Sequence, residues 1–564
     1  MTPLRFAAHV STFALLAATA LAHTPNHYAD QVFRNGNIHT MDPDRPRAEA
    51  LATRGDRIIA IGSSADLKPL IGPQTKLHDL SGKTVLPGLI DAHCHVASLG
   101  SFGLGHIDLS YAESFDDVVQ AVAERVKTAR PGQWILGGRW DHESWPERKM
   151  PAHTRLSAVS PDNPVWLTRV DGHVSLANAA AMKLAGITVD TRSPPGGEII
   201  RDERGSLTGL FVDNADVLIV AKIDDPADPA DLILKAQELC LAVGLTGLHD
   251  AGITPGEVAV YRQLADSGKL KIRVYAMVAA RAAEEYFAQH GLLIGDRLTV
   301  RSAKLFADGA MGSRGAWMYE PYADRPTDSD GRPYTGLNLM TPEFIRRLAD
   351  DGLRKGYQLC THAIGDRANR ETLDAYESAL KQHPQPDHRF RIEHAQVLSP
   401  QDIPRFATLG VVPAMQPTHA TSDMRWCEAR IGPQRSRGAY AWASVLRAGA
   451  RIAGGSDFPV ESHNPFLGIY AAITRQDKDG NPPGGWYPEQ CMTRTEVLRS
   501  FTIDAAYAAF EEGQKGSLTA GKLADFIIID RDVMTCPPRE ILGTRVIRTI
   551  LGGEPVYSRP PACR

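Results

Sequence analysis

The sequence predicts an α/β fold: a TIM-type (β/α)8 barrel, a small composite β domain from both termini, and a large insertion after strand one. Eight apolar runs of strand length alternate with helical patterns along the middle of the chain. Short strand-like segments stand at both ends. A chain of 564 residues is too long for one ordinary core, which favours a large barrel with smaller additional units.

Residues 1–22 have the pattern of a secretory signal peptide. Arg5 supplies a thin positive region, residues 10–20 are almost wholly apolar or small, and Ala20-Leu21-Ala22 offers a cleavage site. The apolar run is too short to span a bilayer, and no stop-transfer pattern follows it. We therefore expect a periplasmic or secreted protein without a membrane span after signal cleavage. The alternatives are a cytosolic protein with an apolar tail and an uncleaved anchor.

The composition excludes several classes of protein. A hydrophobic fraction of 43%, a charged fraction of 23% and a formal net charge of −4 describe a globular protein without a basic face, so no nucleic-acid partner is expected. Seven cysteines are scattered without a C-x-x-C pair, which argues against a zinc ribbon or a thioredoxin motif. One or two disulfides, and a homodimer, remain open.

Both ends of the chain are expected to build one β domain, from residues 23–86 and 511–564. The strand-like segments that suggest it are residues 31–41, 47–62 and 524–530, followed by a hairpin around Gly552-Gly553. Because these short β segments flank a long middle, we expect them to pair with each other.

Residues 87–510 are expected to form the barrel, and its first strand is the run that ends at His93. The other seven strand-like runs are residues 244–250, 271–278, 298–307, 357–362, 390–394, 411–416 and 451–457. Helical patterns such as residues 341–355 and 366–381 separate most of them. Strands that alternate with helices pair in parallel through right-handed crossovers, and eight such units close a barrel.

The insertion is expected at about residues 100–240, since roughly 140 residues separate the first two barrel strands. It has its own helical patterns at residues 115–129 and 177–184, a strand at 165–170 and a Pro/Gly-rich hairpin region at 193–205. We expect it to lie over the mouth of the barrel.

His93 and His95 are the first candidate metal ligands. Residues two apart on a strand point to the same face, so both imidazoles converge while Cys94 faces away. Four more polar residues end apolar strands: Lys304, His362, His394 and Asp457. Each alone is more often a core histidine or an ion-pair partner. Together they indicate a metal centre, because the C-terminal strand ends of a barrel meet at the face where catalytic groups gather.

These side chains suit a divalent metal with a catalytic water. Neutral imidazole and carboxylate bind zinc and similar ions, and an open position leaves room for water. A bound cation lowers the pKa of that water from about 15.7 towards 7, which produces a hydroxide nucleophile. A protonated lysine cannot bind a cation, but burial lowers its pKa, and the neutral amine can react with carbon dioxide. The resulting carbamate is an anionic bridge between two metals.

Six motifs carry a family resemblance: LPGLIDAHCH (residues 86–95), KLFADGAMGSR (304–314), THAIGD (361–366), RIEHAQ (391–396), GSDFPV (455–460) and GKLAD (521–525). With them, nearly the whole mature chain resembles the amidohydrolase superfamily. The closer resemblance is to the family-3 group of metal-dependent hydrolases that includes N-substituted formamide deformylases.

The resemblance implies two zinc ions, with one ion as the alternative. His93 and His95 would bind the more buried ion together with Asp457. The second ion would be bound by His362 and His394, with Lys304, N6-carboxylated, as the bridge. Asp457 would also be catalytic, taking a proton from the attacking water and passing it to the leaving amine.

Further polar and aromatic residues are candidates for contact with substrate. His173 is a second catalytic candidate, because it could polarise the scissile carbonyl, although a structural hydrogen bond is an equal alternative. The substrate-binding candidates are Trp140 and Asp171 in the insertion, His249 after strand two, Asp308 and Arg314 after strand four, and Gln416 and His419 after strand seven. Arg314 could pair with a substrate carboxylate through its bidentate fork, although barrel-loop arginines are commonly solvated or structural.

The leading function is metal-dependent hydrolysis of a C–N bond in a small non-peptide amide, such as an N-formyl or N-acyl amine. A deaminase, or a hydrolase of esters, lactones or cyclic amides, is the first alternative. The residues after His362 are Ala363-Ile364-Gly365-Asp366, without the glutamate proton shuttle that deaminases of this superfamily tend to have. A non-catalytic periplasmic binding or regulatory protein is the second alternative.

Overall fold

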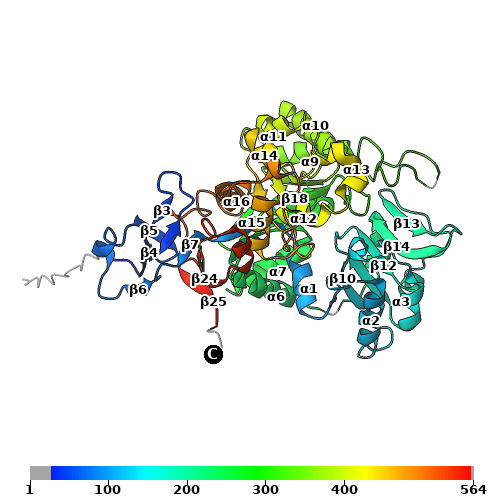
Figure 1. Cartoon of the computed structure of the whole chain (residues 1–564), viewed down its shortest axis with the longest axis horizontal. Helices are drawn as coiled ribbons and strands as arrows, with labels where there is room; N and C mark the ends of the chain where they lie inside the picture. The colour runs from blue at the N-terminus through cyan, green and yellow to red at the C-terminus, as the bar shows by residue number, and fades with distance from the viewer. Residues whose placement is uncertain (1–26, 226, 329, 561–564) are drawn as a thin grey trace, which may run out of the picture.

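The computed structural model describes residues 27–225, 227–328 and 330–560, so the expected signal peptide lies outside the described residues. Figure 1 shows three parts along the longest axis: a β domain at one end, the barrel in the middle and the insertion at the other end. No helix in the described part of the chain is long and apolar enough to cross a membrane. The six described cysteines are all free.

The centre of the molecule is a TIM-type barrel, as the sequence predicts. Its eight strands follow one another in chain order, and neighbours pair in parallel. They are β8 (Leu89–Cys94), β15 (Leu245–Ile253), β16 (Arg273–Ala279), β18 (Leu298–Phe306), β19 (Gln358–Ala363), β20 (Arg391–His394), β21 (Val412–Met415) and β22 (Ala453–Gly454). Beyond β22, the Asp457 N–H donates to the His93 carbonyl and the His95 N–H donates to the Phe458 carbonyl, both at 2.8 Å. These two bonds join the last part of the barrel sheet to the first.

Several helices of the barrel unit begin or end at a recognisable capping residue. Thr254 forms a capping box with Glu257 at the start of α7, and Gly356 ends α9 with a φ of 81°. The helices are α1 (Val96–Gly103), α6 (Pro229–Ala242), α7 (Pro255–Asp266), α8 (Ala280–His290), α9 (Pro342–Lys355), α10 (Asp366–Gln382), α11 (Ile403–Leu409), α12 (Pro417–Asp423), α13 (Cys427–Ser436), α14 (Trp442–Arg447), α15 (Pro465–Thr474), α16 (Arg494–Ser500) and α17 (Ile503–Ala508).

The sequence run that ends at His93 forms two strands that belong to different parts of the molecule. β7 (Thr84–Pro87) pairs with β23 (Phe526–Ile529) in the β domain, and β8 pairs with β15 in the barrel. Gly88 separates them, and a Cβ there would lie 2.2 Å from Thr246 Oγ1. The chain therefore needs glycine where it passes from one part to the other.

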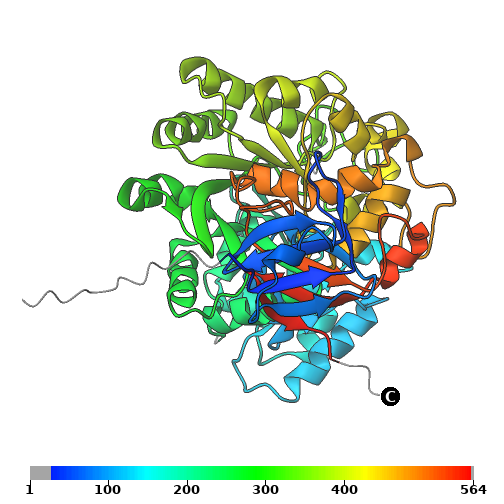
Figure 2. The ribbon, with the colours of Figure 1, turned by 90° about the vertical axis from the view of Figure 1, so that its left-hand side faces the viewer.

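Strands from both ends of the chain share one sheet of the β domain. Its six-stranded sheet has the order β25-β24-β23-β7-β2-β3, and a four-stranded sheet has the order β5-β4-β1-β6. Figure 2 shows the N-terminal (blue) and C-terminal (red) ribbons side by side. The additional strands are β1 (Gln31–Arg34), β2 (Asn37–His39), β3 (Arg47–Ala48), β4 (Ala50–Arg54), β5 (Arg57–Gly62), β6 (Lys76–Asp79), β24 (Val546–Leu551) and β25 (Glu554–Ser558).

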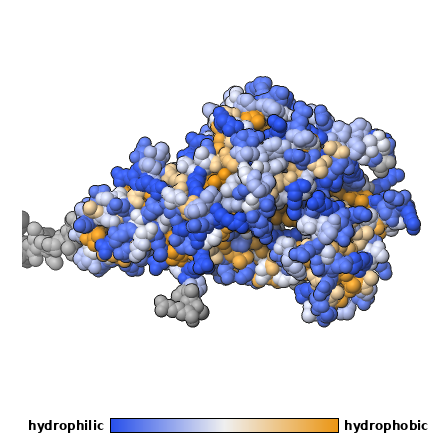
Figure 3. Space-filling view, viewed as in Figure 1, coloured by the Kyte–Doolittle hydropathy of each residue, from blue (hydrophilic) through white to orange (hydrophobic). Residues whose placement is uncertain are grey.

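The insertion folds around a sheet and an apolar core of its own. Its sheet has the order β13-β14-β12-β11-β10-β9, and Trp140, Trp145 and Leu167 belong to the core. Figure 3 shows a largely hydrophilic face over this part and the barrel. The elements are β9 (Ile107–Asp108), α2 (Phe115–Val126), β10 (Ile135–Trp140), α3 (His153–Val159), β11 (Val165–Arg169), β12 (Val174–Ala177), α4 (Ala179–Leu184), β13 (Gly197–Arg201), β14 (Leu207–Asp213) and α5 (Val217–Val220).

The two helices on either side of the insertion hold it against the barrel. α1 follows β8, and α6 leads into β15, so together they fill the place of the first crossover helix. They pack closely because Gly100 has no side chain: a Cβ there would lie 2.0 Å from the Leu232 carbonyl oxygen. The chain thus leaves the barrel after α1 and returns at α6, beside the same strand ends.

Candidate metal centre

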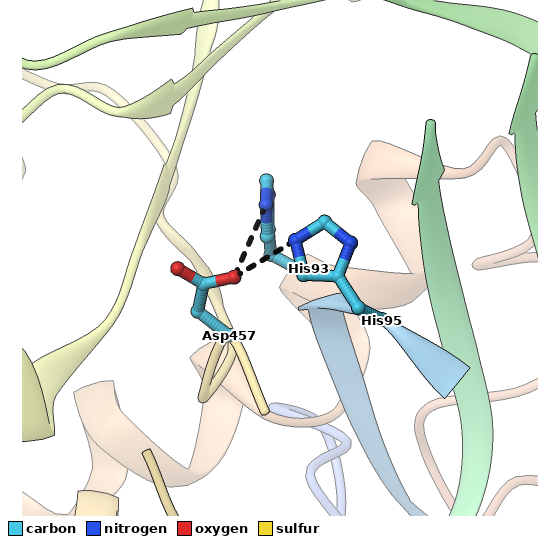
Figure 4. A group of neighbouring side chains, drawn as sticks. All are labelled: His93, His95 and Asp457. Carbon is cyan, nitrogen blue, oxygen red and sulfur yellow. Dashed lines mark ion pairs between the residues drawn. The ribbon is translucent and has the colours of Figure 1, made fainter. Parts of the chain in front are cut away.

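Two imidazoles and one carboxylate converge at the C-terminal mouth of the barrel (Figure 4). Nε2 of His93 lies 3.6 Å from Asp457 Oδ1, and Nε2 of His95 lies 3.2 Å from the same oxygen. Cys94 points away from them, and its thiol donates to the His249 carbonyl at 3.3 Å. The three ligand atoms lie close enough together to hold a metal ion.

Three imidazoles at this mouth are fixed by a hydrogen bond at Nδ1. The acceptors are the Glu393 carboxylate for His93, the Ala251 carbonyl for His95 at 3.1 Å, and the Gln416 amide oxygen for His394 at 2.9 Å. Because each of these oxygens can only accept, Nδ1 carries the proton and the Nε2 lone pair is left for a cation. This donor set of neutral imidazole and carboxylate fits zinc or a similar divalent ion.

A second group of potential ligands lies beside the first. It consists of His394, His419 and Asp457, whose ligand atoms are again close enough to hold an ion. His419 Nε2 lies 3.7 Å from Asp457 Oδ2 and has no hydrogen-bond partner in the described part of the chain, although it is buried. His419, predicted as a substrate-binding residue, therefore belongs to the same centre as the predicted ligands.

The other two predicted ligands border this centre. The His362 ring packs against His394 with the ring centroids 4.5 Å apart. His362 Nε2 faces the Gly309 carbonyl at 3.4 Å, which leaves its Nδ1 for a ligand. Lys304 is buried, and its Nζ lies 3.1 Å from His93 Nε2. All six predicted ligands are thus gathered at one mouth.

The environment favours the protonation states that metal binding requires. Burial lowers the pKa of three of these imidazoles, that of His93 to about 4, and those of His362 and His394 well below the usual range. Burial alone would raise the pKa of Asp457, but the nearby His95 and the other surrounding imidazoles hold it well below its usual range. Burial also lowers the pKa of Lys304 to about 8. Neutral imidazoles and an ionised carboxylate are the forms that bind cations.

The backbone at two predicted ligands lies in the left-handed region. His394 has a φ of 73° and Asp457 a φ of 61°. Residues other than glycine seldom adopt this region, and each instance costs of order 1–3 kcal/mol. Such strain is typical of functional sites, and here it aims both side chains at the centre.

A cavity of about 830 Å³ lies over the centre, and both the barrel and the insertion line it. Asp171 and His173 reach its wall from the insertion, together with Trp166. The His173 ring lies 5.1 Å from the His362 ring, measured between centroids. The insertion therefore covers the mouth of the barrel and contributes polar side chains beside the predicted ligands.

Two predicted substrate-binding residues lie away from this cavity. Trp140 is buried in the core of the insertion, and its indole N–H donates to the Leu167 carbonyl at 2.9 Å. Arg314 forms an ion pair with Asp324 at 2.8 Å. The prediction fails because a tryptophan on a two-sided sheet packs inward, and an arginine on a long loop pairs with a carboxylate of the same loop.

Three more predicted substrate-binding residues support the centre from behind. Gln416 orients His394, as described above. Asp308 accepts hydrogen bonds from the backbone N–H groups of Ile364, Gly365 and Trp317. His249 is buried, and its Nδ1 lies 3.0 Å from Arg391 Nη1. None of the three lines the cavity.

Glu393 is a functional residue that the sequence prediction missed. It is fully buried, it holds His93 Nδ1, and its Oε1 lies 2.8 Å from Nε of the equally buried Arg391. Burial alone would raise the pKa of Glu393, but Arg391 and His93 outweigh it and lower the pKa to about 2. A signal was present, since two charged residues stand two apart on a buried strand and immediately precede His394.

The chain is similar to known proteins over most of its length. The chain matches the family described as "Amidohydrolase family" over residues 76–557. It is 35% identical to Protein LONG AFTER FAR-RED 3 of Arabidopsis thaliana, with 94% of this chain and 92% of that protein covered. It is 30% identical to the N-substituted formamide deformylase of Arthrobacter pascens, with 94% and 98% covered.

A solved structure described as an uncharacterized metal-dependent hydrolase from Pyrococcus horikoshii OT3 has the same fold. It superposes with a TM-score of 0.73 at 26% identity, and the match covers 90% of this chain and 99% of that one. These matches confirm the resemblance carried by the six sequence motifs. The chain belongs to the amidohydrolase family and has the fold of a metal-dependent hydrolase.

Proposed function

We propose that this protein hydrolyses the C–N bond of a small neutral amide, such as an N-formyl or other N-acyl amine. The observation that carries the proposal is the set of Nδ1 acceptors, which leave three imidazole Nε2 atoms for a cation beside the Asp457 carboxylate. The identity of 30% to an N-substituted formamide deformylase supports this class of bond.

We propose that two divalent ions bind here, with zinc as the first candidate and a single ion as the alternative. One ion would be held by His93, His95 and Asp457, and the second by His362 and His394, with carboxylated Lys304 shared between them. A bound divalent cation polarises a carbonyl oxygen and lowers the pKa of water from 15.7 to about 7. Lys304 suits carboxylation because burial lowers its pKa to about 8, which leaves part of the amine neutral near physiological pH.

In this proposal Asp457 moves the proton. The water oxygen bonds to the carbonyl carbon while the ionised Asp457 carboxylate takes one proton from that water. The C–N bond then breaks, and the same proton passes to the leaving nitrogen. Amide and water thus become a carboxylic acid and an amine. Burial alone would lower the pKa of His173, but the Asp213 carboxylate raises it to about 9, so the ring carries a proton on both nitrogens. His173, on the cavity wall, would then donate a hydrogen bond from Nε2 to the carbonyl oxygen as negative charge develops there.

The charges around the cavity favour a neutral substrate. Three arginines line it, and all are paired: Arg139 with Asp108 at 2.9 Å, Arg169 with Asp141 at 2.6 Å and Asp171 at 2.7 Å, and Arg425 with Asp141 at 2.9 Å. Within the described residues, no lining arginine is left to bind a substrate carboxylate in bidentate fashion. N-acyl amines are therefore expected to be better substrates than N-acyl amino acids.

The test combines metal analysis with a substrate panel. The panel contains N-formyl and N-acetyl amines, the matching N-acyl amino acids, an ester and a lactone. We expect stoichiometric divalent metal and turnover of a neutral amide that stops on chelation and returns with added zinc. Metal-loaded protein that hydrolyses the ester or lactone but no amide would refute the assignment of the bond. Protein that binds no stoichiometric metal would favour a binding or regulatory role.

A further inference from the structure

We propose that Asp213 is a positioning residue that orients His173 towards the reacting carbonyl. The glycine-containing loop at residues 308–315, after β18, leaves the space that this pair occupies. The inference rests on the proposed function, because it assigns a role within that reaction. The two residues of the pair come from the insertion, and the loop comes from the barrel.

The sheet of the insertion holds His173 and Asp213 opposite each other. β12 and β14 are antiparallel with Val174 opposite Val212, and the Asp213 N–H donates to the His173 carbonyl at 2.9 Å. The side chains meet as well, with His173 Nδ1 2.5 Å from Asp213 Oδ1. A carboxylate can only accept, so Nδ1 carries a proton, and the protonated ring has a second N–H, at Nε2, to donate into the cavity.

The His173 ring stands on the cavity wall beside one of the predicted metal ligands. His173 lines the cavity, and its ring centroid lies 5.1 Å from that of His362, a predicted ligand on β19. A side chain of the insertion thus stands beside the mouth of the barrel, where a carbonyl oxygen would develop charge. The insertion supplies part of the reaction machinery as well as the cover.

The loop at residues 308–315 is shaped to receive this pair. A Cβ on Gly309 would lie 2.5 Å from Asp213 Oδ2, and one on Gly315 would lie 2.9 Å from the same oxygen. A Cβ on Gly312 would lie 3.1 Å from Arg169 Nη1, another side chain of the insertion. The three glycines of the loop therefore stand where charged side chains of the insertion approach the barrel backbone closely.

The environment of Asp213 agrees with a role in aiming rather than in holding the loop. Its side chain is 1% exposed, and Oδ2 has no hydrogen-bond partner among the residues that the structure describes. Its one side-chain hydrogen bond in that part of the chain is to His173. A carboxylate kept for the stability of the loop would be expected to bond the loop's own N–H groups.

A double-mutant cycle in the full-length, metal-loaded protein tests the assignment. His173→Ala is expected to lower kcat about 10²- to 10³-fold, the usual cost of removing a donor to a developing oxyanion. Asp213→Asn is expected to lower kcat about 10-fold or more with KM changed less than about threefold, because a neutral amide no longer holds the protonated ring in its donating orientation. The double variant should be no slower than His173→Ala alone. Metal content should stay at the wild-type value throughout.

Two outcomes of this cycle would overturn the proposal. One is an Asp213→Asn variant that melts at a lower temperature but keeps its kcat, since Asp213 would then only stabilise the insertion. The other is a double variant in which the two losses in kcat multiply, since the residues would then act independently.

The role of the loop at residues 308–315 is tested by substitutions that add a Cβ atom. Gly315→Ala should displace the Asp213 carboxylate and lower kcat in the wild-type background, but it should have no further effect on His173→Ala protein. Gly513→Ala is the matched control, because a Cβ there would meet no atom within 4 Å. An equal loss of kcat from Gly315→Ala in both backgrounds would contradict the proposal that the loop accommodates the His173–Asp213 pair.

A spectroscopic readout separates this proposal from the proposed function. The hydrogen bond between His173 and Asp213 should give a strongly deshielded imidazole proton resonance in metal-loaded protein without substrate. The resonance should disappear in both single variants. If the resonance behaves in this way but no amide is hydrolysed, the proposed function fails while the pair stands. If the resonance is absent from wild-type protein, the pair itself is refuted.

Discussion

Glu393→Gln tests whether the carboxylate behind His93 sets the metal affinity of the centre. In the structure, Glu393 accepts from His93 Nδ1 and so directs Nε2 to the metal position. A glutamine can present its amide N–H₂ instead, which would favour the wrong tautomer of His93. Loss of such a partner typically weakens metal binding about 10- to 100-fold, which corresponds to about 1.4–2.7 kcal/mol.

The same substitution should also destabilise the metal-free protein. Arg391 and Glu393 are both 0% exposed, so a neutral glutamine leaves the guanidinium charge buried without its counter-ion. Breaking a buried ion pair in this way costs about 3–5 kcal/mol of unfolding free energy. Both effects have one structural cause, but they are measured separately.

The affinity is measured by competition with a chelator of known zinc affinity, and the unfolding free energy by denaturant titration of metal-free protein. Glu284→Gln is the matched control, because Glu284 pairs with Arg347 on the surface, where the two side chains are 40% and 52% exposed. The control should change stability by less than ~1 kcal/mol and leave metal affinity unchanged. A zinc affinity of Glu393→Gln within twofold of wild type would refute the reasoning.

Two further predictions concern the metal centre, and a third concerns Trp140. Asp457→Asn should lower kcat by about 10²- to 10⁴-fold with an unchanged circular dichroism spectrum, since asparagine cannot take a proton; near-normal turnover would contradict this. Removal of metal with a chelator should lower the melting temperature, because an ion at 100 times its Kd stabilises the folded state by about 2.7 kcal/mol. Undiminished activity in verified metal-free protein would exclude a catalytic role for the metal. Trp140→Phe should lower the unfolding free energy by about 1–3 kcal/mol, because a buried carbonyl loses its donor, and should leave KM unchanged. A raised KM at unchanged stability would return Trp140 to the substrate site.

Local sequence pattern was sufficient for most of the fold. The helical pattern at residues 341–355 corresponds to α9 (Pro342–Lys355), and the strand-like run at 298–307 corresponds to β18 (Leu298–Phe306). Periodicity and end signals are local properties, so they can be read without tertiary contacts. Local pattern did not predict that the run ending at His93 forms two separate strands. The two strands meet at Gly88, whose requirement for glycine depends on the close approach of Thr246.

At the candidate site, too, some features could be predicted from local sequence and others depend on tertiary contacts. His93, His95, Lys304, His362, His394 and Asp457 could be named because each stands near the end of a barrel strand, and the topology brings those ends to one mouth. Which side chains are buried, and which partners they bond, could not be predicted from their positions at strand ends. Trp140 and Arg314 have residue types that suit substrate binding, but local packing and a nearby Asp324 give them other partners.

The sequence by itself therefore determined the barrel, the family and the ring of candidate ligands, because these follow from short-range periodicity and from motifs at strand ends. Only the tertiary structure decided which side chains support them. Glu393 reaches His93 across 300 positions of sequence, and Asp213 reaches His173 across 40. A charged side chain is paired by whatever lies within a few ångströms after folding, and short-range sequence pattern does not contain that distance.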